Sequence, residues 1–254
     1  MIQTRLRELA INGGVVTAVA PDAWRLRLPP TPAGYADAQV DDYGLVGAGR
    51  RHYPWSPGTR LRVQARFSHP AGALLGTAGF GFWNAPFGDP TVRRPALPQA
   101  AWFFYASAPG DLPLAPWGPG RGWFAATLDA AAPRALALIP VAPLVLLLNQ
   151  VAALRRRLWP AVQRRLGVSF APLDTSMTAW RSYELAWRAD GCVFTVDGRV
   201  VLQTPFAPRG PLGFVCWIDN QYLVATAHGR YAWGVLPTSA EQWLEVAALQ
   251  LERF

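Results

Sequence analysis

The stretch from Trp180 to Leu202 constrains the fold more than any other part of this chain. Along residues 183–188, large apolar side chains alternate with polar ones, which is the period of two of a half-buried β-strand. Two Asp-Gly pairs, at 190–191 and 197–198, are turn signals, and the segments after them are rich in β-branched and aromatic residues. The stretch therefore predicts three short antiparallel strands joined by two tight turns.

This stretch also resembles the YxxxWxxDxxxFxVDG signature of glycoside hydrolase family 16 and related laminarinase-like proteins, matched here by Tyr183, Trp187, Asp190, Phe194, Val196, Asp197 and Gly198. Other segments resemble the family's early strands (43–44 and 61–67), its aromatic strand (79–83) and its closing strand (244–251). The resemblance covers residues 22–134 and 173–254. It implies an all-β, two-sheet antiparallel concanavalin-like jelly-roll sandwich with a concave carbohydrate groove.

The resemblance also shows what this chain lacks. A family member carries a Glu-x-Asp-x-x-Glu strand shortly after the aromatic strand, because a retaining glycosidase needs two carboxylates about 5 Å apart. In this chain the corresponding segment, residues 100–107, reads AAWFFYAS. The only glutamates are Glu8, Glu184, Glu241, Glu245 and Glu252. The resemblance therefore implies the fold without the family's hydrolysis, as in a pseudoenzyme.

Aromatic residues are the main candidates for a ligand site. The resemblance implies that six residues surround the concave sheet, namely Trp83, Asn84, Trp102, Phe104, Trp123 and Trp217. Aromatic rings stack on the apolar faces of sugars, and a neighbouring amide binds hydroxyl groups. The alternative is that each of these rings packs in the core. Alternation does not settle which face of residues 102–105 is inward, since all four are aromatic.

A second group of candidates follows Trp217. If Trp217, Asp219 and Gln221 share one face of a strand, that face has an aromatic platform beside two polar groups. Asp219 is equally suited to capping a turn. His228 is a candidate general base beside Asp219, although a single histidine is more often structural. Asp219 and His228 are thus the alternative catalytic pair for a hydrolase acting on a glycan.

Residues 135–172 are expected to be an insertion within a single domain spanning residues 1–254. Its first part, 135–148, is uncharged, apolar and interrupted by two prolines. From Leu144 onward apolar residues recur every three or four positions, which predicts an amphipathic helix kinked at Pro160 and ended by Gly167.

Three interpretations of this insertion are open: a lid packed on the sandwich, a helix lying in a membrane interface, or a protein interface. An interfacial helix typically inserts leucine and tryptophan into the acyl boundary, and its arginines contact anionic headgroups. A helix with one apolar stripe is more often a lid packed on its own sheet. The uncharged apolar segment 135–148 is nevertheless larger than one lid helix needs to bury, and such a patch left exposed would mark a contact surface. The contact candidates are Leu147, Val151, Leu154, Arg156, Arg157, Leu158 and Trp159.

Composition limits the remaining possibilities. All 24 basic residues are arginine and the net charge is +8, but charge alone does not establish a nucleic-acid partner, and none is expected. Cys192 and Cys216 lie in strand patterns and are expected to be buried free thiols. No cysteine and histidine spacing suggests a zinc site, no cofactor is expected, and a calcium site would leave no spacing signature.

The amino-terminal residues do not resemble a secretory signal. We therefore expect a cytoplasmic protein, or one peripheral on the cytoplasmic face of a membrane. The preferred hypothesis is a carbohydrate- or glycolipid-binding, or structural, glycosidase-like module without catalysis. Its partners would be a saccharide in the groove and a membrane or protein surface at residues 135–167.

Overall fold

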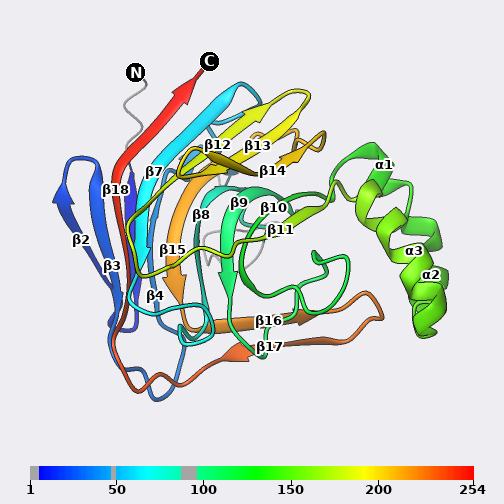
Figure 1. The fold of residues 1–254 in the computed structure, drawn as a ribbon, viewed down its shortest axis with the longest axis horizontal. Coiled ribbons are helices and arrows are strands. Elements are labelled where there is room, and N and C mark those ends of the chain that lie inside the picture. Colours follow the sequence, from blue (N-terminus) through cyan, green and yellow to red (C-terminus); the bar gives the residue numbers. More distant parts are fainter. Residues whose placement is uncertain (1–5, 47–49, 87–95) are drawn as a thin grey trace.

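A computed structural model describes residues 6–46, 50–86 and 96–254, and these residues form two seven-stranded antiparallel sheets packed face to face (Figure 1). Sheet A contains, in spatial order, β1 (Arg7–Ile11), β4 (Asp37–Asp41), β15 (Gly213–Asp219), β8 (Thr77–Trp83), β9 (Gln99–Ala106), β10 (Gly122–Asp129) and β11 (Ser169–Pro172). Sheet B contains β14 (Arg199–Thr204), β13 (Gly191–Val196), β12 (Arg181–Arg188), β7 (Thr59–Phe67), β18 (Gln242–Arg253), β3 (Ala23–Leu28) and β2 (Val15–Ala20). The predicted jelly-roll sandwich is confirmed.

Two short ribbons complete the strands of the described chain. One pairs β5 (Gly44–Val46) with β6 (Arg50–His52), and the other pairs β16 (Gln221–Ala225) with β17 (Tyr231–Val235). The second ribbon begins directly after β15, because the chain turns at Asn220 and leaves sheet A.

The strands predicted between residues 180 and 202 are confirmed as β12, β13 and β14 at one edge of sheet B. The turn between β13 and β14 has positive φ angles at both central residues, +48° at Asp197 and +77° at Gly198. A two-residue hairpin turn of this kind suits the twist of the strands it joins, which explains the Asp-Gly pair.

The main core lies between the two sheets, and period-two alternation decides which side chains enter it. On β9, Phe103 and Tyr105 point inward, whereas Trp102 and Phe104 belong to a second cluster on the opposite face. Cys192 and Cys216 are buried in the main core and are unpaired, as the sequence predicted. Burial raises the pKa of both thiols.

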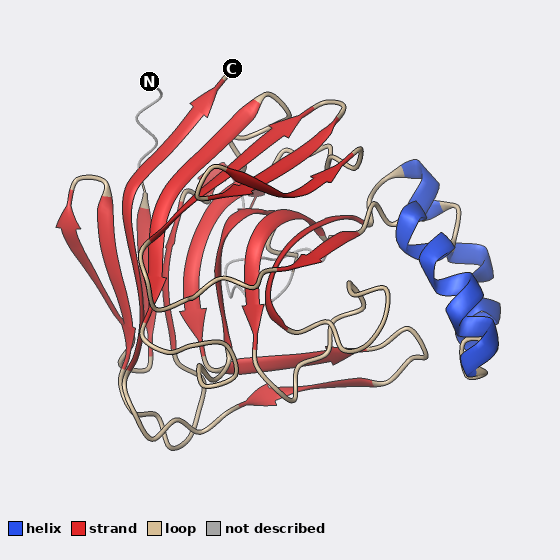
Figure 2. Ribbon diagram, viewed as in Figure 1, coloured by secondary structure: helices blue, strands red, loops and turns tan. Residues whose placement is uncertain are grey.

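The inserted segment forms a helical arm at one side of the sandwich (Figure 2). The arm, residues 133–165, consists of α1 (Pro133–Leu136), a 3-10 turn η1 (Ile139–Val141), α2 (Ala142–Leu148) and α3 (Ala152–Arg165). No helix among the described residues combines the length and the apolar character needed to span a membrane.

Two predictions for the insertion were wrong in detail. The single helix expected from Leu144 is interrupted after α2, where the buried Asn149 donates from Nδ2 to the carbonyl of Ala227 at 2.7 Å. The insertion also ends earlier than expected, since residues 169–172 form β11 and pair with β10. Helix α3 continues through Pro160, and Gly167 follows it with a φ of +63°.

The arm does not act as a lid that buries its own apolar side chains. Eight of its aliphatic side chains are between 37% and 67% exposed, namely Leu136, Ile139, Val141, Leu144, Leu146, Leu147, Val151 and Leu154. The residues of the arm that are buried are Ala135 and two amides, Asn149 and Gln163. The fully buried anchors of the arm thus include two polar side chains, and these eight aliphatic side chains face solvent.

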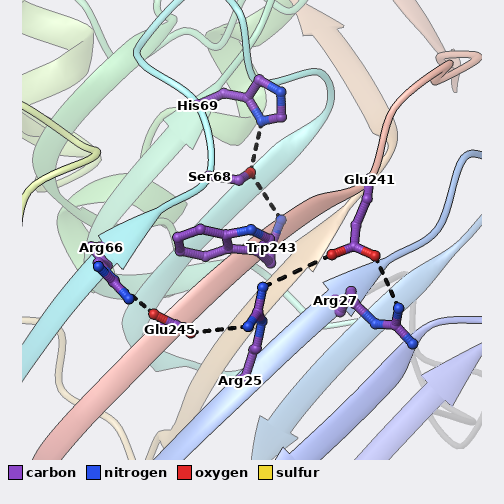
Figure 3. Close-up of polar contacts among 8 residues, drawn as sticks. All are labelled: Arg25, Arg27, Arg66, Ser68, His69, Glu241, Trp243 and Glu245. Carbon is purple, nitrogen blue, oxygen red and sulfur yellow. Dashed lines mark hydrogen bonds and ion pairs between the residues drawn. The ribbon is translucent and has the colours of Figure 1, made fainter.

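The outer face of sheet B carries a network of ion pairs (Figure 3). Glu245 accepts from Arg66 at 2.6 Å and lies 3.5 Å from Arg25, while Glu241 lies 2.9 Å from Arg27 and 3.9 Å from Arg25. A second group on the same face joins Arg60 and Arg62 to Glu184 and Glu252. Four of the five glutamates of the chain thus belong to this face.

Candidate functional site

The outer face of sheet A, turned away from sheet B, gathers most of the candidate ligand residues. The strand register places Trp217 of β15 beside Gly79 of β8, and Gly79 beside Phe104 of β9. One step along, Gly81 lies beside Trp102. The face therefore presents alternate residues from each strand, and its aromatic members are Trp83, Trp102, Phe104, Phe124 and Trp217.

Two glycines of β8 make room for the large rings of the strands on either side. A Cβ atom on Gly79 would lie 3.0 Å from Cη2 of Trp217, and one on Gly81 would lie 2.7 Å from Cβ of Trp102. The indoles therefore fill the space above β8. The ring centroids of Trp83 and Trp102 are 4.5 Å apart, and those of Phe104 and Trp217 are 5.3 Å apart.

Most of this aromatic cluster is covered. Trp102 is 6% exposed, and Phe104 and Trp217 are each 9% exposed, because Leu112 and Leu114 of the loop between β9 and β10 pack against them in the same cluster. Trp83 is half-buried at the edge of the cluster. Trp83 is therefore the least buried of the three indoles on this face.

The indole nitrogen of Trp102 is the unusual atom of this cluster. It is buried and has no hydrogen-bond partner, whereas the indole of Trp217 donates to Oγ1 of Thr77 at 2.9 Å. Buried donors in folded proteins nearly always have a partner, so the indole N–H of Trp102 is a candidate donor to a ligand.

Asp219 lies at the other end of this face and is held entirely by its neighbours. Its Oδ1 accepts from the hydroxyl and amide of Thr77 at 2.9 and 3.2 Å and from the amide of Gln221 at 3.1 Å. Its Oδ2 accepts from the side chain of Gln221 at 2.8 Å. Burial raises the pKa of Asp219 to about 7, against the opposing effect of these hydrogen bonds.

Two further carboxylates share this face and were missed by the sequence analysis. Asp37 lies directly opposite Asp219 on β4, and Asp41 forms a bidentate pair with Arg7, whose Nη2 is 2.8 Å from Oδ2. All three carboxylates are at most 2% exposed. The alternation of polar and apolar residues along 37–41 was the signal that would have placed them.

Two sequence candidates, Trp123 and Asn84, lie elsewhere or are already engaged within the chain. Trp123 points into the main core between the sheets, 5.2 Å from the ring of Phe67, because its strand presents Phe124 outward instead. The amide of Asn84 is used within the chain, accepting from the amide of Gln99 and donating to the carbonyl of Leu97. Neither side chain is presented to a ligand.

His228 is separated from Asp219 by the whole of β16. A strand rises about 3.3 Å per residue, so β16 alone spans roughly 13 Å. His228 lies beyond its far end, in the turn before β17. The structure therefore does not bring Asp219 and His228 together as an acid and base pair.

The outward residues of β9 are Ala100, Trp102, Phe104 and Ala106, and those of β8 are Thr77, Gly79, Gly81 and Trp83. No carboxylate stands on this face of either strand. Among the residues that the structure describes, no group of three or more His, Cys, Asp or Glu side chains is placed to hold a metal ion.

Comparison with known proteins supports the architecture. No protein-family model and no curated sequence matches this chain. Among solved structures, a β-glucanase from Bacillus licheniformis is 9% identical with a TM-score of 0.50, the match covering 100% of this chain and 94% of that one.

Two other solved structures are similar at lower TM-scores. A glycoside hydrolase family protein from Mycobacterium thermorestibile is 11% identical with a TM-score of 0.45, covering 91% of this chain and 76% of that one. The carbohydrate recognition domain of Emp47p is 11% identical with a TM-score of 0.45, covering 99% and 92%. At these identities the similarity is one of fold.

Proposed function

We propose that the outer face of sheet A binds a saccharide and does not hydrolyse it. The observation that carries this proposal is the composition of the face, where three indoles, Trp83, Trp102 and Trp217, gather and where β8 and β9 present no carboxylate. The resemblance to laminarinase-like proteins supports the same conclusion, because their groove lies on the corresponding sheet. An indole supplies a flat apolar surface together with a hydrogen-bond donor.

The route of binding begins at Trp83. Its ring is half-buried and lies against that of Trp102, whose N–H is unsatisfied. A sugar ring stacked on Trp83 brings a hydroxyl oxygen toward this donor after a small displacement of the Trp83 side chain. The hydrogen bond would pair a buried donor that has no partner among the described residues.

The same geometry argues against hydrolysis. A retaining glycosidase needs one carboxylate as nucleophile and another as acid and base, both in contact with the substrate. Asp37 and Asp219 are opposite each other, but each is only 2% exposed and Asp219 accepts four hydrogen bonds from the chain itself. Both carboxyls therefore belong to the packed interior of the fold and are not presented to a substrate.

The experiment is a glycan-array screen followed by calorimetric titration of the best saccharide. We expect Trp83→Ala to weaken binding about tenfold, since a lost aromatic contact costs roughly 0.5–1.5 kcal/mol. Trp233→Ala is the matched control, because that indole is 71% exposed on β17. Equal losses in the two variants, or release of reducing ends from the bound glycan, would contradict the proposal.

A second candidate function, attachment to an anionic membrane surface, is favoured by the arm. Its exposed aliphatic side chains stand beside six arginines, and residues 130–173 contain no acidic residue. Leu147, Val151 and Leu154 are exposed at 67%, 53% and 37%. A surface that combines aliphatic side chains with uncompensated arginine fits the boundary between anionic headgroups and acyl chains.

Vesicle flotation tests this candidate. Leu147→Asp is expected to reduce binding to vesicles containing anionic lipid at least tenfold, because a charge cannot enter the acyl boundary without a large desolvation cost. The control is Val200→Asp, at a position that is 58% exposed on sheet B. If the two variants float equally well, the arm is not the membrane contact. A cytoplasmic location remains a prediction from the sequence.

A further inference from the structure

A cleft of about 340 Å³ lies where the arm meets the sandwich, and none of the indoles on the outer face of sheet A lines it. Three segments line it: α3, the loop between β9 and β10, and the turn between β16 and β17. The side chains that give it chemical character are Asp111, Trp117, Arg155, Arg156, Trp159 and His228. Its volume is within the range of small-ligand sites in proteins.

Three side-chain amides, of which Asn149 and Gln163 are buried, hold the walls of this cleft in place. Gln163 of α3 is 5% exposed and donates from Nε2 to the carbonyls of Pro113, Leu114 and Ala115 at 2.9–3.2 Å. Asn149 and Gln150 donate to the carbonyls of Ala227 and His228, each at 2.7 Å. The cleft is therefore formed before any ligand arrives, which lowers the entropic cost of binding.

The loop wall is fixed to the ribbon as well. The amide of Asp111 donates to the carbonyl of Leu223 at 2.9 Å, and the amide of Ala225 donates to the carbonyl of Asp111 at 2.8 Å. The carboxylate of Asp111 accepts from the amide of Gly120 at 2.9 Å, which orients it at the cleft.

The cationic side of the cleft comes from α3. Arg155 is half-buried and donates from Nη1 to the carbonyl of Asn149 at 2.7 Å, so that its guanidinium is oriented. Arg156 is exposed beside it. Within the described part of the chain, neither arginine forms an ion pair, although Asp111 lines the same cleft. An arginine without a carboxylate partner offers bidentate donors to an external anion.

The cleft also has an aromatic side. Trp117 is 58% exposed in a loop that is otherwise anchored by hydrogen bonds, and Trp159 is half-buried on α3. A large indole kept exposed at the mouth of a preformed cleft is suited to contact with the flat face of a ligand ring. The cleft therefore combines guanidinium groups, indole faces and a carboxylate that accepts hydrogen bonds from hydroxyls.

We propose that this cleft binds an acidic sugar, a pyranose ring carrying a carboxylate. The sugar carboxylate pairs with Arg155 and Arg156, the ring stacks on an indole, and Asp111 accepts a hydrogen bond from a ring hydroxyl. The acidic sugar is either a residue of a soluble saccharide or the headgroup of a glycolipid. This site is independent of the saccharide face of sheet A.

The test is a calorimetric titration with a β-linked glucuronate oligosaccharide and with the neutral glucose oligosaccharide of the same linkage. We expect the acidic compound to bind at least tenfold more tightly. Arg156→Ala and Trp117→Ala should each weaken its binding about tenfold. Their matched controls are Arg199→Ala and Trp233→Ala, two exposed side chains outside the cleft, and these should change binding less than twofold.

Vesicles distinguish the two sources of the sugar. Phosphatidylcholine vesicles with and without a glucuronosyl diacylglycerol are compared for wild type and Arg156→Ala. Binding that needs the glycolipid and is lost in the variant identifies a headgroup site, and binding to the oligosaccharide alone identifies a soluble ligand. The proposal is overturned if neither probe binds, if the neutral oligosaccharide binds equally, or if Arg199→Ala has the same effect as Arg156→Ala.

Discussion

The outer face of sheet B and the helical arm use the same basic residue in opposite ways. On sheet B, five arginines lie within ion-pair distance of four glutamates, and these arginines are Arg25, Arg27, Arg60, Arg62 and Arg66. In the arm, six arginines stand in a segment without any acid. Within the described residues, no arginine of the arm forms an ion pair.

This difference shows where the net charge of +8 acts. Paired charges on sheet B largely cancel at a distance, and exposed ion pairs contribute little to stability individually. Uncompensated arginines on the arm keep a field that attracts anions. The aliphatic residues divide in the same way, since those of the sheets are buried between them and those of the arm are exposed.

The largest expected effect concerns two buried carboxyls that are held by hydrogen bonds, namely Asp219 and Asp42, whose Oδ1 accepts from the amide of Phe214 at 2.7 Å. Burial raises the pKa of Asp42 and of Asp219 from 3.8 to about 7. Between pH 4 and 7 the folded protein therefore holds protons that the unfolded chain has released, so raising the pH lowers the unfolding free energy by several kcal/mol. The contribution is fully present below pH 4 and lost above pH 7.

Urea unfolding of wild type and Asp219→Asn at several pH values between 4 and 8 measures this effect. The amide resembles the protonated acid in shape, so the difference between the two proteins isolates one carboxyl. We expect the variant to gain stability relative to wild type as the pH rises. A difference that does not change with pH would show that the Asp219 carboxyl has an ordinary pKa.

The next largest effect is expected when unpaired arginines of the arm are removed. Arg157→Gln combined with Arg164→Gln should weaken binding to anionic vesicles by about 2 kcal/mol, roughly 30-fold, at low salt. The equivalent double change on sheet B, Arg25→Gln with Arg27→Gln, should leave vesicle binding unchanged. Co-sedimentation with vesicles measures both, and equal losses would mean that overall charge, rather than the arm, directs binding.

A smaller effect is expected from the network of sheet B. Glu245→Gln should lower the unfolding free energy by about 1 kcal/mol, because Glu245 is the least exposed acid of the network and contacts two arginines. Glu252→Gln serves as the comparison, since that carboxylate is 40% exposed. Chemical denaturation at pH 7 should rank Glu245 above Glu252, and the reverse order would contradict the importance of burial.

The smallest effect is expected on stability when an unpaired arginine of the arm is replaced. Arg157 is exposed and unpaired, so Arg157→Gln should change the unfolding free energy by less than about 0.5 kcal/mol. Thermal unfolding of the variant checks this. A clear loss of stability would show that this arginine has a role within the fold and is not available to a partner.

Local pattern was sufficient for the strands and turns of β12 to β14, whereas the sandwich was implied by the family resemblance of that stretch. Alternation with a period of two, followed by Asp-Gly pairs, encodes a strand and its turn within a few residues of one another. The absence of glutamate near residues 100–107 likewise required no structure, since a side chain that is not encoded cannot act. Burial of Cys192 and Cys216 followed from the same strand patterns.

Other features depended on the pairing of distant segments. Four consecutive aromatics on β9 carry no alternation, so only the packing of sheet B against Phe103 and Tyr105 decided that Trp102 and Phe104 face outward. The proximity of Asp37 and Asp219 also depended on tertiary structure, because the register of β4 with β15 makes them neighbours.

The arm and its cleft are the clearest product of tertiary structure. The helical periodicity of residues 144–166 predicted an apolar stripe, but not that polar anchors such as Asn149 and Gln163 would be the buried side chains. Sequence determined which side chains were available, because period and composition are local properties. Tertiary structure decided which of them are buried, paired or exposed, because those outcomes depend on hydrogen bonds and packing between segments that lie far apart in the chain.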